Sequence, residues 1–349
     1  MIEKKALNKR GFAIQFNWIF VLIGGAVILG FFFSLITNQA SDEEKRSAQE
    51  STQAIDTLLK ISLAARDTQK IVPFDKKIYF SCDEISQYYV EGAFKYSRYD
   101  YNVVFSPDEL ESKELLIQNL VFEAPFRTIP LVYVTNRDIE YVFVGDSSII
   151  NLLYRLMPEN TTKKIIPSGN ITDYPNNNYD HTVFVLNSSD EIYLSRLANF
   201  NNPNNKAYAI IIKPQGGLVS DYGEVTFYHY AASSFLYDGT ALFIDLKTAL
   251  GSIIGHNKAI YECNLKKILQ RLALLSQLHK ERMIYYGSHS TESCQPHYAV
   301  AETYFEKIKQ YAEEKGPSIG DFKILVTVIY DLRSLNRYLI TQTECPLIY

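Results

Sequence analysis

The most regular hydrophobic pattern of the chain lies near its beginning. Residues 18–36 include no charged side chain, and Ser34 is the single polar interruption. A helix rises about 1.5 Å per residue, so this segment would extend roughly 28 Å, close to the thickness of the hydrocarbon core of a bilayer. The pattern predicts a transmembrane helix over residues 11–37, preceded by a basic tail over residues 1–10.

The charges on either side of this segment predict its orientation. Four basic residues precede it, against one acid: Lys4, Lys5, Lys9 and Arg10. Asp42, Glu43 and Glu44 follow it before any further Lys or Arg. Because excess Lys and Arg remain on the cytoplasmic side, we expect a cytoplasmic amino terminus and an extracytoplasmic main domain in the cell membrane. The alternative is a cleaved signal peptide, whose apolar region is only about 7–15 residues long, so the sequence favours an uncleaved anchor.

Beyond the apolar segment the pattern becomes amphipathic. Small and apolar residues recur at helical spacing: Ala54, Ile55, Leu58, Leu59, Ser62 and Leu63. This spacing predicts a helical stalk over residues 38–70, either continuous with the membrane helix or broken near 37–41, and ended by Val72-Pro73. The apolar stripe of the stalk needs cover, from the globular part or from a second copy of the chain.

Residues 71–255 alternate between strand-like and helix-like patterns. Strands are expected over 77–82, 101–105, 131–135, 139–144, 164–166, 181–186, 207–212 and 225–230. Helices are expected over 149–156, with Asp146 or Ser147 as N-cap, and from Asn187 to about residue 198. The turn at 136–138 would close a hairpin or begin a crossover. The alternation predicts an extracytoplasmic α/β domain, with an α+β fold as the alternative.

The last part of the chain, residues 256–349, has a helical period. Apolar faces predict three antiparallel helices over about 264–286, 298–312 and 319–341. No cysteine forms a Cys-x-x-Cys pair, and an even number of cysteines in an external region suggests disulfides.

The lengths of these helices predict how the cysteines pair. A helix of about 22 residues separates its ends by roughly 33 Å, so the second and third helices would bring Cys345 beside Cys294. Bridged cysteines need Cα atoms within about 7 Å. We therefore predict a Cys294–Cys345 bond and a Cys82–Cys263 bond that staples the helical subdomain to the α/β domain. If the chain bends back after Tyr286, Cys263 would pair with Cys294 instead.

Composition and short motifs add the remaining expectations. The formal net charge of −4 and the pI near 5.9 give no basic field for nucleic acid. Asn-x-Ser/Thr triplets make three asparagines candidate glycosylation sites in an external domain: Asn160, Asn170 and Asn187. Three glycines in the apolar segment would allow close helix packing, and thus self-association or contact with other envelope proteins: Gly24, Gly25 and Gly30.

No residue pattern identifies a catalytic, cofactor-binding or metal site. His289, Cys294 and His297 lie close in sequence but lack the fourth ligand of a zinc site. The segment 144–148 follows a strand, where α/β enzymes bind ligands, but it has no glycine-rich phosphate-binding or nucleophile-elbow motif, so we interpret it as helix capping.

Two resemblances bear on function. Lys9-Arg10-Gly11, followed by Phe12 and an apolar helix that continues into a stalk, resembles the amino terminus of type IV pilin-like precursors. That resemblance implies cleavage after Gly11 by a prepilin peptidase and assembly through the helix. The chain departs from the family at Phe16, where pilins usually carry Glu, and its globular part is much larger than a typical pilin head.

The second resemblance spans nearly the whole chain. The segments 15–20, 80–82, 261–263 and 345–349 are similar to those of uncharacterised single-pass membrane proteins of small-genomed (DPANN-type) archaea. It implies a cell-envelope protein and no activity.

The sequence supports three hypotheses of function. The first is a single-pass membrane-anchored envelope protein whose external domain binds or scaffolds other components. The second is a pilin-like subunit of a surface filament or secretion assembly, processed after Gly11. The third is an extracytoplasmic enzyme built on the α/β part, although no catalytic pattern favours it.

Overall fold

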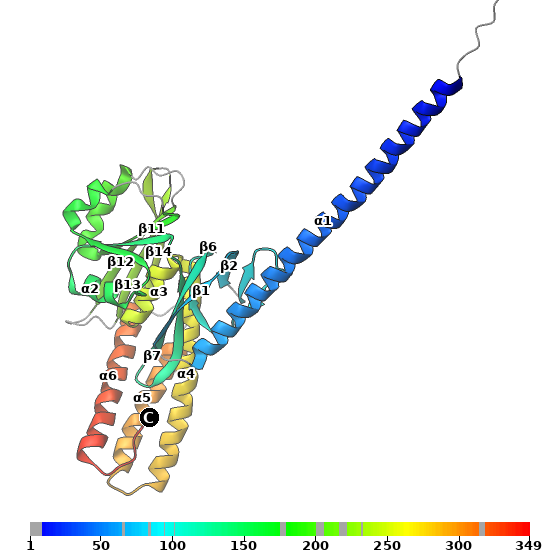
Figure 1. Ribbon diagram of the computed structural model, residues 1–349. Coiled ribbons are helices and arrows are strands. Elements are labelled where there is room, and N and C mark those ends of the chain that lie inside the picture. Colours follow the sequence, from blue (N-terminus) through cyan, green and yellow to red (C-terminus); the bar gives the residue numbers. More distant parts are fainter. Residues whose placement is uncertain are drawn as a thin grey trace, which may run out of the picture.

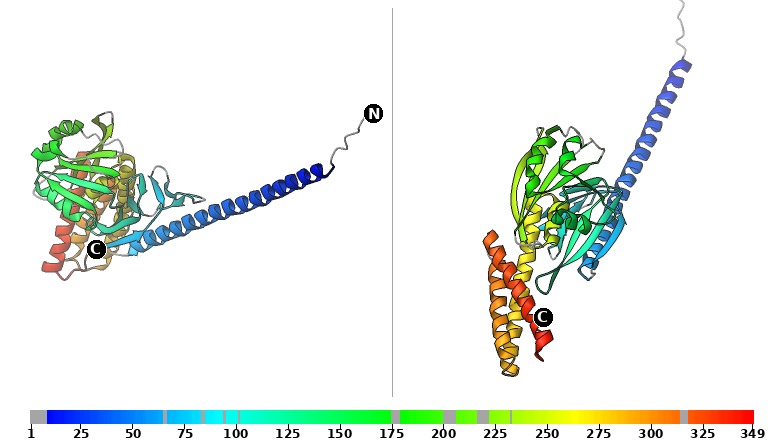
Figure 2. Two further views of the ribbon diagram at one scale, coloured as in Figure 1. Left: turned by 45° about the horizontal axis from the view of Figure 1, so that its top comes forward. Right: turned by 90° about the vertical axis from the view of Figure 1, so that its left-hand side faces the viewer.

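The structure is a computed structural model that describes residues 9–64, 67–82, 85–93, 95–100, 102–174, 179–199, 206–215, 222–231, 233–313 and 318–349. Within these ranges the side chains at 9–20, 35–42, 44, 62–64, 171–173 and 196–199 lie outside the description. The molecule consists of a long helical rod that projects from a globular body (Figures 1 and 2).

The rod is a single helix, α1 (Lys9–Ala64). The chain contains no proline in this range and no glycine after Gly30, so nothing in the backbone interrupts the helix. Of the two alternatives for the stalk, the continuous helix is confirmed, and no break occurs near 37–41. Strand β1 (Thr68–Pro73) already begins at Thr68, so the stalk is shorter than the predicted 38–70, and Val72-Pro73 lies in a strand.

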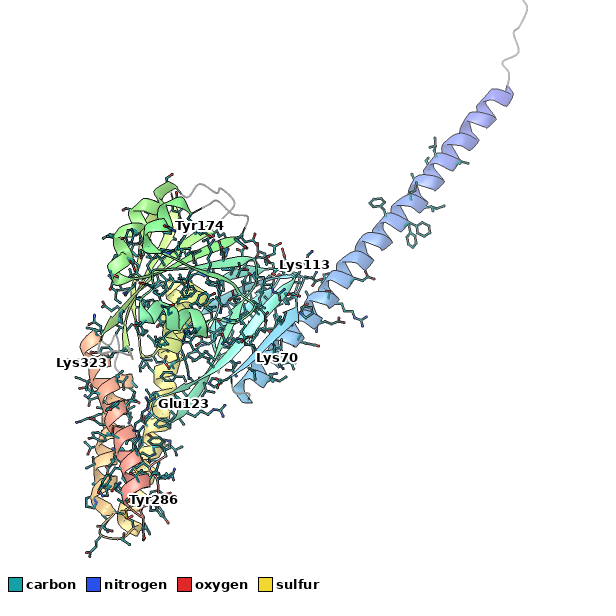
Figure 3. All side chains as sticks on the ribbon, turned by 60° about the vertical axis from the view of Figure 1, so that its left-hand side comes forward. Lys70, Lys113, Glu123, Tyr174, Tyr286 and Lys323 are labelled. Carbon is teal, nitrogen blue, oxygen red and sulfur yellow. A yellow bond between two sulfur atoms is a disulfide. The ribbon has the colours of Figure 1, made fainter. Side chains whose placement is uncertain are left out.

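The carboxyl-terminal part of α1 packs on the body, whereas its middle part stands free of it. Ala48, Ile55 and Leu59 are 0%, 3% and 3% exposed within the main core, so the globular part covers the stripe that the sequence left without a partner. Side chains farther along the rod point away from every other element (Figure 3).

The predicted membrane segment is described only in part. The tail 1–8 and the side chains of 11–20 and 35–37 lie outside the described residues. Among the residues that are described, no helix is long and apolar enough to cross a membrane.

The described residues form three sheets, of which two are largely antiparallel and lie next to α1. The first sheet has the order β1-β7-β8-β5. Besides β1 it contains β7 (Glu114–Glu123), β8 (Arg127–Thr135) and β5 (Val103–Phe105). The β5–β8 pair is parallel, and the other two pairs are antiparallel. The second sheet has the order β4-β3-β2-β6 and contains β4 (Ser97–Arg98), β3 (Ser86–Val90), β2 (Lys77–Cys82) and β6 (Glu109–Glu111).

The third sheet has six strands in the order β10-β9-β11-β12-β13-β14. These are β10 (Thr162–Ile166), β9 (Ile139–Val144), β11 (His181–Asn187), β12 (Lys206–Gln215), β13 (Tyr222–Ala231) and β14 (Ser234–Phe243). The first four are parallel and the last two are antiparallel. Its connections include α2 (Ser148–Leu156) and the 3₁₀ segments η1 (Ser168–Asp173) and η2 (Ser188–Asn199).

The described architecture is mixed α+β rather than α/β throughout. Among the described residues, strands alternate with helical turns from β9 to β12, and within this part β9 and β11 are buried along almost their whole length. The turn at 136–138 closes no hairpin, because β8 belongs to the first sheet and β9 to the third.

Four helices complete the body: α3 (Leu246–Gly255), α4 (Lys258–His289), α5 (Gln295–Glu313) and α6 (Ile319–Gln342). The first half of α4 lies against the sheets, where the Asn264 side chain forms hydrogen bonds of 2.7 and 3.2 Å with the backbone of Val104. Its second half forms a bundle with α5 and α6, as the yellow to red ribbons show (Figure 1). One hydrophobic core runs from the sheets into this bundle.

Two disulfides join distant parts of the chain, and they are the pairs that the helix lengths predict. Cys82 at the end of β2 bonds to Cys263 (Cα–Cα 5.8 Å), and Cys294 bonds to Cys345 (Cα–Cα 5.7 Å). Cys263 lies inside α4 rather than just before the helix, and the alternative Cys263–Cys294 pair does not form. The first bond links the second sheet to α4, and the second closes the free end of the bundle.

Candidate functional site

A polar cleft lies between the second and the third sheet. It has a volume of about 320 Å³ and is bounded by the amino ends of β9, β11 and β12, by β6 and by the turn at 136–138. Its lining is mostly polar: Glu109, Leu110, Glu111, Asn136, Ile139, Asp180, His181 and Lys206.

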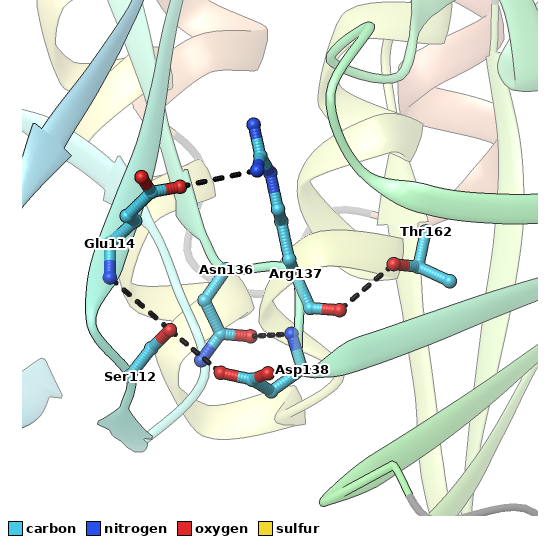
Figure 4. A network of polar contacts seen from close by, with 6 residues as sticks. All are labelled: Ser112, Glu114, Asn136, Arg137, Asp138 and Thr162. Carbon is cyan, nitrogen blue, oxygen red and sulfur yellow. Dashed lines mark hydrogen bonds and ion pairs between the residues drawn. The ribbon is translucent and has the colours of Figure 1, made fainter.

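The turn between β8 and β9 gives the cleft a rigid wall (Figure 4). The Asn136 side chain donates to the Glu111 carbonyl (3.2 Å) and accepts from the Asp138 backbone N–H (3.1 Å). The Ser112 hydroxyl donates to the Asp138 carboxylate at 2.7 Å. An ion pair of 3.4 Å joins Arg137 to a glutamate of β7. Because Asn136 is 2% exposed and both ends of its amide are bonded, the turn holds one conformation.

Charges in the cleft are unevenly satisfied. Glu109 lies 2.6 Å from the ammonium of Lys77 and 3.7 Å from that of Lys206, and the Lys77 hydrogen bond lowers the pKa of Glu109. In contrast, burial, followed by the charges of Asp138 and Glu111, raises the pKa of Asp180. The cleft thus has a neutralised carboxylate on one side and mutually repelling carboxylates on the other.

One buried histidine, His181, lines the cleft, and a second, His256, contacts it. Burial lowers the pKa of His181, which is 7% exposed, to about 4, and it lowers the pKa of His256 well below its usual value. The two rings are 5.5 Å apart, and the ring of Tyr208 lies 4.1 Å from that of His256. Both ring nitrogens of His256 and Nδ1 of His181 have no hydrogen-bond partner among the described residues.

The chemistry of this cleft suits recognition better than catalysis. Both imidazoles are neutral at pH 7, and the lining contains no serine, threonine or cysteine that could act as a nucleophile. Carboxylates, an amide and a lysine can instead exchange hydrogen bonds with a polar ligand.

At the carboxyl end of β9 the chain lies close to side chains of η1 and η2. Gly145, which has φ +91°, follows β9, and a Cβ there would lie 3.1 Å from the Asp190 carboxylate and 3.2 Å from the Ser168 hydroxyl. Ser168 donates to Asp190 at 2.9 Å. Ser147 is the N-cap residue of α2, but its side chain makes no capping hydrogen bond.

The other candidate residues lie apart from the cleft. His289 ends α4 and stacks on Tyr285, whereas His297 on α5 lies beside Tyr338. In the part of the chain that the structure describes, no three His, Cys, Asp or Glu side chains form a group suited to a metal ion.

The structure also places the candidate glycosylation sites and the glycines of the apolar segment. Asn160 and Asn170 are exposed, whereas Asn187 is half-buried and accepts a hydrogen bond from the Ser188 backbone. Apart from the neighbouring backbone of α1, no atom lies within 4 Å of a Cβ built at any of the three glycines of the predicted membrane segment: Gly24, Gly25 and Gly30. Gly11 belongs to the backbone of α1, in the stretch whose side chains are not described.

Sequence reasoning did not find the cleft, because its groups come from strand ends that are far apart in the chain. His181 and Lys206 are each the first residue of a buried strand, and that position was the one available signal. Comparison of the chain with protein-family models, with curated proteins and with solved structures gives no match, so only its own geometry bears on function.

Proposed function

We propose that the protein is a single-pass, membrane-anchored component of the cell envelope. In this proposal the amino terminus is cytoplasmic, and the disulfide-linked body lies outside, where it binds or scaffolds other envelope components. The observation that carries the proposal is the exposed apolar surface in the middle of α1.

That surface surrounds the helix. Large apolar side chains at residues 21–34 are 56–72% exposed, and they follow one another through several turns. A partner helix covers one stripe, whereas lipid covers every face, so apolar residues on all sides favour a bilayer. The charge-free sequence continues from residue 18 to residue 36.

The two disulfides support an external body. Both lie in the part of the chain that follows the apolar segment, and disulfides persist in oxidising compartments. The binding role rests on the polar cleft, where rigid polar groups surround a space without a nucleophile.

A pilin-like subunit is the second candidate. It is favoured by the continuity of α1 from the apolar segment into the core of the body. In such a subunit the same helix would pack against other subunits at one end and hold the body at the other. Intact-mass measurement of the native protein separates the two candidates, since loss of residues 1–11 indicates processing after Gly11.

Membrane anchoring is tested by fractionation of cells that produce the full chain. We expect the protein to remain in the membrane pellet after a carbonate wash, and protease added to intact cells to degrade the body. A variant with Val27→Arg and Ile28→Arg should move to the soluble fraction, whereas Lys113→Gln on the body should not. A body that protease reaches only after lysis would contradict the topology.

A further inference from the structure

A second cavity, remote from the polar cleft, gathers positive charge. It has a volume of about 720 Å³ and lies between the start of β8, the middle of α4 and the segment before β5. Three cations line it, Arg127, Lys267 and Arg271, against one acid, Asp100. This excess of positive charge contrasts with the net charge of −4 of the chain.

The cations of this cavity are poorly neutralised. The side chains of Arg127 and Arg271 form no hydrogen bond or ion pair with any described residue. Asp100 already lies 3.6 Å from Arg98 on the second sheet and accepts a hydrogen bond from the Ser86 backbone. Lys267 and Arg271 are four residues apart on α4, so they occupy one face of the helix and repel each other.

Lys267 is held partly out of water. Its ammonium donates to the Asn102 carbonyl at 3.0 Å and lies 4.6 Å from the centre of the Tyr99 ring. Burial lowers the pKa of Lys267 to about 8, and only Asp100 acts to raise it. A bound anion would supply the negative charge that this ammonium lacks.

The rest of the lining is mostly apolar, with Thr128 and Gln270 as its uncharged polar residues. Ile129 and Pro130 come from β8, and Leu275 comes from α4. A pocket of this size with apolar walls and a few convergent charged groups is typical of a site for a small molecule.

We propose that the cavity between β8 and α4 binds a small organic anion, with a carboxylate held by Arg127, Lys267 and Arg271 and an apolar stem packed on Ile129 and Leu275. A guanidinium offers paired donors that match the two oxygens of a carboxylate, which makes carboxylate the favoured head group. The site lies on the body and does not depend on membrane anchoring.

The test uses the full chain in nanodiscs, with hexanoate as the probe. Ligand-observed NMR measures the binding of hexanoate. Acetate is the control for the stem, and hexanamide, which has the same stem without the charge, is the control for the head group. We expect saturable hexanoate binding with a Kd on the order of 1 mM, an affinity within reach of so small a ligand. Acetate and hexanamide should bind about tenfold more weakly or not at all.

Substitutions locate the site. Arg127→Gln and Arg271→Gln are exposed changes that should each weaken hexanoate binding about tenfold. Lys266→Gln is the matched control, because Lys266 is adjacent on α4 but lines a different groove, with Glu262 and Glu313, and it should leave the affinity unchanged. Thermal unfolding of each variant checks that the fold is retained.

The pH dependence gives a readout that a structural role would not produce. Between about pH 7 and pH 9 arginine and aspartate side chains keep their charges, so Lys267 is the cation facing the cavity that titrates. Hexanoate affinity should fall as the pH rises through about 8, and Lys267→Met should bind more weakly with no such step. Unsaturable binding, equal binding of hexanamide, or equal losses in Lys266→Gln and Arg271→Gln would overturn the proposal.

Discussion

The hydroxyl of Tyr88 donates a 2.6 Å hydrogen bond to the carboxylate of Asp56, which joins β3 to the last third of α1. The same hydroxyl lies 3.0 Å from the carbonyl oxygen of Thr52. Tyr88 is fully buried, and burial together with the Asp56 contact raises its pKa, so the phenol stays protonated and can donate. Through this pair the second sheet helps to hold the last third of α1 against the body.

Tyr88→Phe should loosen the rod from the body. The change leaves the carboxylate of Asp56 without its 2.6 Å donor, and we expect the free energy of unfolding to fall by about 1–2 kcal/mol. Hydrogen exchange of the α1 amides at 45–61 should accelerate. Tyr96→Phe, at a tyrosine that is 58% exposed, is the control and should change neither quantity. Equal effects of the two substitutions would show that the Tyr88–Asp56 bond does not hold α1.

The two disulfides should contribute unequally to stability. In the chain-entropy model the contribution grows with the logarithm of the loop length, and the loops span 181 and 51 residues. Replacing Cys82 and Cys263 together by Ser should cost about 1 kcal/mol more than replacing Cys294 and Cys345, out of roughly 3–5 kcal/mol for each bond. Urea denaturation of the two double variants measures the difference. A larger loss of stability in the variant without Cys294 and Cys345 would indicate that native packing near α5, rather than loop closure, determines the contribution of each disulfide.

The sequence predicted these bonds because helix length translates directly into the position of a helix end. It also predicted β9 and β11, which are buried along almost their whole length and consist mainly of apolar residues. It did not predict β7, where Gln118 and Asn119 break the apolar run. In the folded chain Gln118 donates to the Leu156 carbonyl at 3.2 Å, a partner 38 residues away that no local pattern reveals.

The sequence did not predict the location of the candidate cleft for a related reason. The turn at Asn136 has the residues of a hairpin, and whether β9 pairs with β8 or with another sheet is decided by contacts beyond the turn. Once β9 joins the third sheet, the amino ends of β9, β11 and β12 converge on β6. A sequence pattern places each strand but not the sheet that it joins.

The membrane-segment glycines allow a test of self-association. Because a Cβ at Gly24, Gly25 or Gly30 meets no atom of the same chain apart from the neighbouring backbone of α1, Gly25→Leu should leave the unfolding of the body unchanged. If copies pack through the face that holds Gly25, the larger side chain separates the helices and cross-linking between copies in membranes should fall several-fold. Ala26→Leu, about 100° farther around the helix, is the control. Identical cross-linking in Gly25→Leu and the natural chain would exclude the face that holds Gly25 as the contact.

The buried histidines should make the body less stable in mild acid. His181 has a pKa of about 4 in the folded chain and an ordinary value of 6.5 when unfolded, so between these values the unfolded chain binds more protons. Stability is therefore complete above about pH 6.5 and falls as the pH drops toward 4. For His181 alone the loss between about pH 7.5 and about pH 5 amounts to about 2 kcal/mol, and His256, whose pKa is also lowered, adds to it in the same direction.

Urea denaturation at these two pH values measures the loss directly. The chain with His181→Gln should lose about 2 kcal/mol less between them, because the substituted side chain takes up no proton in either state. His289→Gln, at an exposed histidine on the last turn of α4, should retain the full pH dependence. A pH dependence that survives His181→Gln unchanged would assign it to other groups, and Asp180 is not among them. Its raised pKa means that the folded chain binds the extra proton, which stabilises the fold in acid rather than weakening it.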